Sequence, residues 1–234
     1  MLQAGVCLLL SLGAGFIALR ALRYAISEQL VAYAWFWVLT SFLWGLFGVR
    51  YLLIAFNFRG MTTFTIFLAS QTTIFFLGPV LYYFLGLRVY ANHKLARVLA
   101  MQCLVVAAVA TILVYLPDGT TVLPPTEFGA EIAISNVAWG LFMAEIVGIL
   151  GSLIIDLTRR WSHQFVSQVA RYEFSYSAAL VMYIGLGAFD QSSAVTGVGL
   201  VGLRLLYLVP LVYAYWGLQA QHEYFTMTKI AVAV

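Results

Sequence analysis

Two ionisable residues, Glu145 and Arg204, stand inside long apolar stretches of the sequence, where charges are otherwise rare. A charge at the centre of a lipid bilayer costs about 2.5 to 3.5 kcal/mol on insertion scales, so such residues are usually paired or functional. Counting at 1.5 Å per residue along the two stretches puts both residues at roughly mid-depth. We therefore expect Glu145 and Arg204 to form an ion pair that fixes the register of their helices, provided that these helices adjoin.

Small residues support that pairing. Ala144, Gly148 and Ser152 recur every four residues around Glu145, and glycines precede Arg204. Such stripes permit close helix packing in membranes and would bring the two helices together. Two functional alternatives stay open. An unpaired Glu145 facing a wet cavity would suit a proton or ion coupling site, and Arg204 would suit recognition of an anionic headgroup or ligand.

A second candidate site lies in the stretch that begins at Met61, which carries the densest polar content of any apolar segment. Its central members are Ser70, Gln71, Thr72 and Thr73. Hydroxyls of this kind can bond back to their own helix carbonyls, which would make the helix self-satisfied. Alternatively, this face lines a cavity that opens outward, with Gln71 as a neutral hydrogen-bonding ligand for a small molecule.

The composition identifies the class of protein that must position these residues. Hydrophobic residues make up 63% of the 234 residues and charged residues only 9%, with a mean hydropathy of +0.96. Soluble domains carry roughly 25% charged residues, so this chain is typical of an integral membrane protein. We expect one all-α domain over residues 1–234, a bundle of seven transmembrane helices. The expected spans are residues 2–24, 30–56, 61–87, 95–116, 130–157, 169–189 and 195–219.

The spans are expected to be helices, because every backbone N–H and C=O in the hydrocarbon core of a bilayer must be paired within its segment. The orientation follows from the basic residues, which fall mainly on alternate connections. The N-terminus is therefore expected outside and the C-terminus in the cytoplasm, in a bacterial inner membrane. The basic residues on the expected cytoplasmic side are Arg20, Arg23, Arg88, Lys94, Arg97, Arg159, Arg160, Arg171 and Lys229.

Partners and cofactors are argued mainly from the residues that could hold them. The basic clusters around Arg88 and around Arg159 and Arg160 would attract anionic lipid headgroups, so membrane lipid is an expected partner. Other membrane subunits are possible partners, and nucleic acid is not expected. His93, His163 and His222 fall in the connections or the tail, which argues against an intramembrane haem. No span carries the lysine that a retinal Schiff base needs. We expect no cofactor and no metal.

The segment Gly78-Pro79-Val80-Leu81-Tyr82-Tyr83, in a chain of seven helices with its N-terminus outside, resembles the sensory membrane regions that precede output domains in some bacterial regulators and histidine kinases. The resemblance covers this segment and the topology. It departs after Gln219, where the remaining residues are too few for such an output domain.

Enzymatic activity has no positive support, because the sequence lacks phosphate-loop, zinc-protease and nucleophile-elbow motifs. The leading hypothesis is a non-enzymatic seven-helix module that senses a small ligand or serves as a membrane subunit of a larger complex. The alternative is a small transporter or ion-coupled carrier that uses Glu145.

Overall fold

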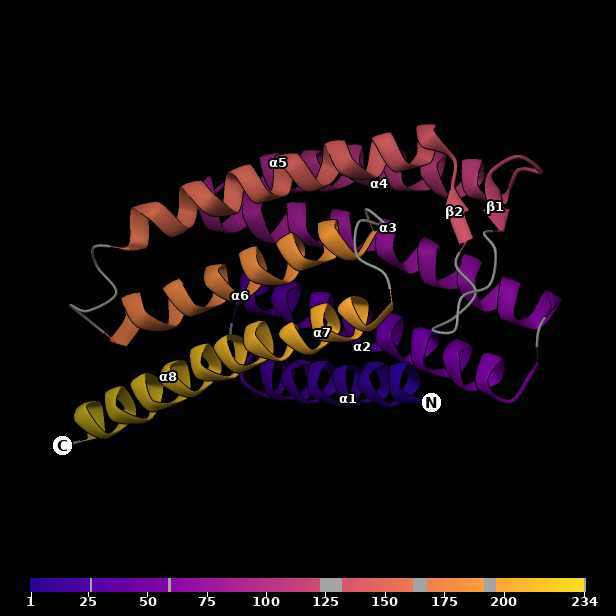
Figure 1. Cartoon of the computed structure of the whole chain (residues 1–234). Coiled ribbons are helices and arrows are strands. Elements are labelled where there is room, and N and C mark those ends of the chain that lie inside the picture. The colour runs from indigo at the N-terminus through magenta and orange to yellow at the C-terminus, as the bar shows by residue number, and fades with distance from the viewer. Residues whose placement is uncertain (26, 59, 123–131, 162–167, 192–196, 234) are drawn as a thin grey trace.

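The chain folds into a bundle of long helices, with its two termini at opposite ends of the bundle (Figure 1). The computed structural model describes residues 1–25, 27–58, 60–122, 132–161, 168–191 and 197–233. We call the end at which α1 begins the N-terminal end of the bundle and the opposite end the C-terminal end. The helices are α1 (Leu2–Arg23), α2 (Glu28–Ala55), α3 (Met61–Val89), α4 (His93–Tyr115), α5 (Asn136–Trp161), α6 (Gln168–Gln191), α7 (Gly197–Leu206) and α8 (Leu208–Ala233).

Six of the described segments are long and apolar enough to cross a membrane. They are α1 to α5 and the segment Gly197–His222, which joins α7 to most of α8. This finding confirms the prediction of a helical membrane bundle.

Helix α6 is not among these six segments, although the sequence analysis expected a span at residues 169–189. Its side chains from Phe174 to Leu180 are all buried, and α6 packs against α5, α7 and α8 (Figure 1). A helix covered by other helices does not need an apolar surface toward lipid, and α6 accordingly carries Ser175, Tyr176 and Ser177 in its buried run. Its lower hydropathy fits its central place.

The helix bounds differ from the expected spans mainly in the second half of the chain. Helix α5 begins at Asn136, because residues just before it form the strand β2 (Ile132–Ile134), which pairs antiparallel with β1 (Thr120–Val122). The expected start of the fifth span at Ala130 lies outside the described residues, as do the expected start of the seventh at Val195 and the residue His163.

The expected seventh span is divided at Tyr207, which separates α7 from α8. Pro210 explains the break, since it lacks an N–H to bond the carbonyl of Leu206 and its ring clashes with that carbonyl. The backbone N–H of Tyr207 instead bonds the carbonyl of Arg204 at 3.1 Å, a tighter turn. In contrast, α3 continues through Pro79 without interruption.

Helices α1 and α2 meet through small residues. Ser11 and Ser41 each donate a hydroxyl hydrogen bond to the other's backbone carbonyl, at 2.7 and 2.8 Å. At Gly48 an added Cβ would lie 2.7 Å from a side-chain carbon of Leu8, so a larger residue there would require the Leu8 side chain to shift. Close backbone contact of this kind is a common way to join membrane helices. The tight pair forms one wall of the bundle.

Aromatic rings join α2 to α6 in the core. The indole N–H of Trp44 donates to the Tyr183 hydroxyl at 2.9 Å, and the rings of Tyr33 and Tyr176 lie 4.6 Å apart between centroids. Trp37 packs edge-on against Tyr183 at 5.5 Å. Aromatic pairs in such geometries contribute about 0.5 to 1.5 kcal/mol beyond their burial. These contacts hold α6 against α2.

Candidate functional site: a central cavity between buried charges

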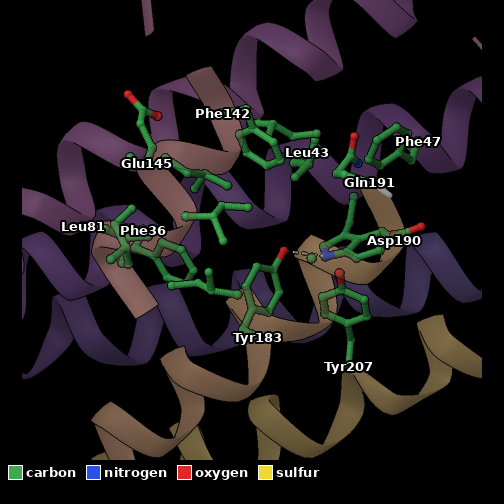
Figure 2. Close-up of a pocket in the computed structure, with 18 residues that line it drawn as sticks. Phe36, Leu43, Phe47, Leu81, Phe142, Glu145, Tyr183, Asp190, Gln191 and Tyr207 are labelled. Atoms are coloured by element: carbon green, nitrogen blue, oxygen red, sulfur yellow. Dashed lines mark hydrogen bonds between the residues drawn. The ribbon is translucent and has the colours of Figure 1, made fainter. Parts of the chain in front are cut away.

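A cavity lies between α2, α3, α5 and α6. Most of its wall is aromatic or aliphatic, including Phe36, Leu81 and Phe142 (Figure 2). Its charged or amide-bearing lining residues are Glu145, Asp190 and Gln191. In Figure 2 Glu145 lies at one side of the cavity, and Asp190 and Gln191 lie at the other. The arrangement suits a largely apolar molecule with few hydrogen-bonding groups.

Glu145 projects from the middle of α5 and is buried. The thiol of Cys103 on α4 donates a hydrogen bond to its carboxylate at 3.1 Å. Gly78 on α3 leaves room for the group, since a Cβ there would lie 3.0 Å from Oε2 of Glu145 and 2.8 Å from the Cys103 sulfur. The carboxylate points away from Phe36 and Tyr183 (Figure 2). Glu145 thus borders the cavity, with its acid group held between α3 and α4.

Arg204 lies in a different environment, near the N-terminal end of the bundle. Its guanidinium forms an ion pair with Asp190 at 3.5 Å and donates a hydrogen bond to the Gln3 side chain at 2.7 Å. The same group lies over the ring of Tyr51, 4.9 Å from its centroid, and within 6 Å of the rings of Trp44 and Phe47. Aromatic faces partly replace the missing solvent around the cation.

The expected pairing of Glu145 with Arg204 is therefore replaced by two separate arrangements. Arg204 takes Asp190 as its acidic partner, and in the part of the chain that the structure describes no ion pair involves Glu145. Gln3 is the second residue of α1 and Asp190 the next to last of α6, so Arg204 lies near helix ends and not at mid-depth. The number of residues from the end of one helix gives the depth of a side chain in the bundle only when all helices end at the same level.

The small-residue stripe around Glu145 also meets a different helix from the one expected. A Cβ at Gly148 would collide with the Tyr82 hydroxyl on α3, so this face of α5 packs on α3 and not on α7. Small residues predict that a close contact exists, but they do not specify its partner.

The polar set on α3 is mostly satisfied within its own helix. The hydroxyls of Ser70, Thr72 and Thr73 donate to backbone carbonyls four residues earlier, at 2.7, 3.0 and 2.8 Å. Gln71 is buried, and none of the four residues is among those that line the central cavity. The wall of the cavity on α3 consists of Ile74, Leu77, Gly78 and Leu81.

A dense charge network near the C-terminal end of the bundle was missed by the sequence analysis. The carboxylate of Asp156 on α5 accepts hydrogen bonds from Nε of Arg88, Nε of Arg160 and the hydroxyl of Ser177, at 2.8, 2.8 and 2.5 Å. Arg160 also pairs with Glu173 on α6. A nitrogen of Arg88 donates to the backbone carbonyl of Glu173.

Two of the arginines expected to face lipid headgroups, Arg88 and Arg160, are thus engaged inside the protein. The available signal was Asp156, an acid four residues before Arg160 near the end of an apolar stretch. Such spacing puts the two side chains on one helix face. The roles of Arg88, Glu173 and Ser177 come from distant parts of the chain, and no local pattern marks them.

Comparison of the chain with models of protein families, with curated proteins and with solved structures finds no match.

Proposed function

We propose that the chain is a non-enzymatic membrane module that senses a small, largely apolar molecule bound in the central cavity. The observation that supports this function is the cavity itself, which has an apolar wall and polar groups at two of its sides. Four helices contribute to the wall, so a ligand would contact all of them at once. A ligand that fits one packing of these helices better than another shifts the population toward that packing, and this shift is the signal.

A pair of cavity and surface substitutions tests the proposal. Ile146→Phe adds a ring to the cavity wall, whereas Ile154→Phe makes the same change on the exposed face of the same helix, where Ile154 is 48% exposed. Binding of fluorobenzyl alcohol, a small apolar probe with one hydroxyl, is followed by fluorine NMR on the protein in nanodiscs.

We expect saturable binding to the unaltered protein and to the Ile154 variant, and at least a tenfold loss in the Ile146 variant, because the ring takes up the space. Equal binding by both variants would place the probe outside the cavity and remove the support for a sensor.

The module has a second form, in which it serves as a membrane subunit that packs against other proteins. Large apolar side chains are exposed along α1 and α4, including Leu12, Leu19, Val105 and Ile112, and lipid or a partner helix must cover them. Co-purification from native membranes in mild detergent tests this form. A chain that always runs without other proteins contradicts it.

A specific observation favours transport as the second candidate function. A further cavity lies between α2, α3, α6 and α8 at the C-terminal end of the bundle. Its deepest residues, Tyr33 and Phe84, belong to the same aromatic core as Phe36, which lines the central cavity. Two cavities separated by aromatic residues, with Glu145 outside any described ion pair, fit a carrier with a closed central gate. Glu145→Gln should then abolish coupled flux in reconstituted vesicles, and unaltered flux would eliminate Glu145 as the coupling group.

We also propose that the chain crosses a bacterial inner membrane seven times, with its N-terminus outside. The opposite positions of the two termini in Figure 1 and the basic residues on alternate connections support this arrangement. Tags on both termini test it, and labelling of both from the same compartment contradicts it.

A further inference from the structure

An open groove lies on the surface of the bundle between α2 and α3, and it shares no lining residue with the central cavity. Its wall from α2 includes Val31, Ala32 and Trp35, and its wall from α3 includes Pro79 and Val80. Trp35 is 51% exposed and Val31 37%, so the groove opens outward. Hydrocarbon surrounds such a groove in a bilayer, so a lipid acyl chain is available to fill it.

One end of the groove is polar. Ser27, Glu28 and Tyr83 lie there, where α2 begins and α3 nears its end. The Tyr83 hydroxyl donates a hydrogen bond to Oε2 of Glu28 at 2.8 Å, which joins the two walls at this end. Trp35 follows Glu28 by about two turns of helix, so the lining changes from polar to apolar along α2. This gradient matches an amphiphile with its headgroup beside Glu28 and a chain beside Trp35.

The carboxylate of Glu28 can accept further hydrogen bonds. A ring nitrogen of His93 lies 3.2 Å from the same Oε2 atom, so the contacts with Tyr83 and His93 leave Oε1. The side chain is 58% exposed, and a group from outside the protein can therefore reach it. A carboxylate offers about four acceptor sites, and a primary ammonium carries three N–H donors. An ammonium is thus the headgroup end that suits Glu28.

Arg97 adds a positive charge at the same end of the groove. It is exposed near the start of α4 and acts electrostatically on both Glu28 and Tyr83. A phospholipid carries its phosphate close to its ammonium, and a basic side chain attracts that phosphate. An anionic headgroup without an ammonium is attracted by Arg97 but repelled by Glu28. The two charges together complement a zwitterionic headgroup.

We propose that this groove binds phosphatidylethanolamine, a phospholipid whose headgroup ends in a primary ammonium, with the ammonium hydrogen-bonded to Glu28 and one acyl chain along Val31 and Trp35. The site is separate from the central cavity of the proposed sensor and does not depend on that function. Its occupant differs from the anionic lipids expected around the basic clusters, because an acid lies at the headgroup position.

Native mass spectrometry tests this inference on the full chain, released from nanodiscs with equal amounts of dioleoyl phosphatidylethanolamine, phosphatidylcholine and phosphatidylglycerol. The three lipids share their chains, so only the headgroup distinguishes them. Choline has methyl groups in place of N–H donors, and the glycerol headgroup has no ammonium. We expect about threefold more bound phosphatidylethanolamine than either other lipid, a modest ratio because exposed charge pairs contribute little.

Glu28→Gln tests the recognition of the headgroup. The variant keeps the size of the side chain and one acceptor oxygen but loses the charge, so the preference for phosphatidylethanolamine should disappear. Asp118→Asn makes the same kind of change at an exposed turn outside the groove and should keep the threefold preference.

Val31→Trp tests the place of the chain, because the added indole takes up space in the groove. This variant should lose the selectively retained phosphatidylethanolamine. Val105→Trp makes the same change on α4 at a residue that is 61% exposed and outside the groove, and it should retain the lipid. Soluble phosphoethanolamine, which has the headgroup without the chains, should not displace the lipid.

Five results would overturn the inference. Equal retention of phosphatidylethanolamine and phosphatidylcholine, or an unchanged preference in the Glu28 variant, would remove the role of the ammonium. Unchanged retention by the Val31 variant, or displacement by phosphoethanolamine, would remove the role of the groove. Preferential retention of phosphatidylglycerol would assign the site to an anionic headgroup.

Discussion

The two ends of the bundle keep buried charge in different ways. Near the C-terminal end, Asp156 accepts three side-chain hydrogen bonds and joins two arginines. Near the N-terminal end, Arg204 has one acid at 3.5 Å, one amide and the Cys7 sulfur at 3.8 Å, and aromatic rings lie around its guanidinium. Two polar atoms there, Nε of Arg204 and Nε2 of Gln3, have no partner among the described residues. One end thus relies on hydrogen bonds, and the other relies largely on ring faces.

A buried arginine can thus be stabilised mainly by hydrogen bonds to a carboxylate or largely by the aromatic rings around it. The two arrangements should respond differently when the acid is neutralised. An arginine bonded mainly to a carboxylate becomes an uncompensated charge when that carboxylate is neutralised. An arginine that is also surrounded by rings keeps part of its stabilisation. The variants below test this difference.

Asp156→Asn should have the largest effect. It leaves Arg88, with a 1% exposed side chain, without its counter-charge, and breaking a buried pair costs about 3 to 5 kcal/mol. The measurement is unfolding in mixed micelles with increasing denaturing detergent. Asp118→Asn, at an exposed turn, is the control and should change nothing. A loss below 1 kcal/mol would show that the network does not stabilise this end.

Asp190→Asn should cost less, about 1 to 3 kcal/mol in the same assay, because Gln3 and the ring of Tyr51 still contact the guanidinium. The asparagine oxygen can still accept one hydrogen bond. If this variant were as unstable as the Asp156 variant, the rings would contribute nothing and the distinction between the two ends would fail.

Gln3→Leu should cost about 1 kcal/mol, since it removes one hydrogen bond to Arg204 but leaves the ion pair with Asp190. The double variant with Asp190→Asn sharpens the comparison. Because both residues bind one guanidinium, the combined loss should differ from the sum of the single losses by at least 0.5 kcal/mol. Strict additivity would mean that the two contacts are independent.

Glu28→Gln should have the smallest effect, with no measurable change in unfolding. Glu28 accepts a hydrogen bond from Tyr83 at 2.8 Å and lies 3.2 Å from a ring nitrogen of His93, but its side chain is 58% exposed and that of His93 61%. Water competes for both partners at such a surface. A clear loss of stability would show that this exposed pair belongs with the buried ones.

The sequence was sufficient for the helices of the first half of the chain. The expected spans at 2–24, 30–56, 61–87 and 95–116 lie within two residues of α1 to α4 at each end, because each apolar run ends where polar residues begin. The prediction from sequence was less accurate at the start of α5, because residues before Asn136 form the strand β2. It also missed the break at Tyr207, although Pro210 is a signal for that break.

Of the candidate site residues, the sequence indicated that Glu145 and Arg204 are unusual, but it gave each the wrong neighbour. Glu145 meets Cys103 and Gly78, and Arg204 meets Asp190. The hydroxyl-rich face of α3 was predicted to line a cavity, but most of its hydroxyls donate to backbone carbonyls of their own helix instead. The type of a residue indicates how much free energy its burial costs. Which residue it contacts depends instead on how the two helices are rotated about their axes.

What the sequence by itself determined is the environment of this protein and its secondary structure. Hydrocarbon admits only segments that pair their own backbone groups, so long apolar runs must become helices whatever their neighbours are. Tertiary structure alone decided which faces meet, and thereby produced the Asp156 network, the aromatic contact between α2 and α6 and the two cavities. The physical reason is that helix contacts in lipid depend on shape and on single hydrogen bonds, which composition and periodicity do not encode.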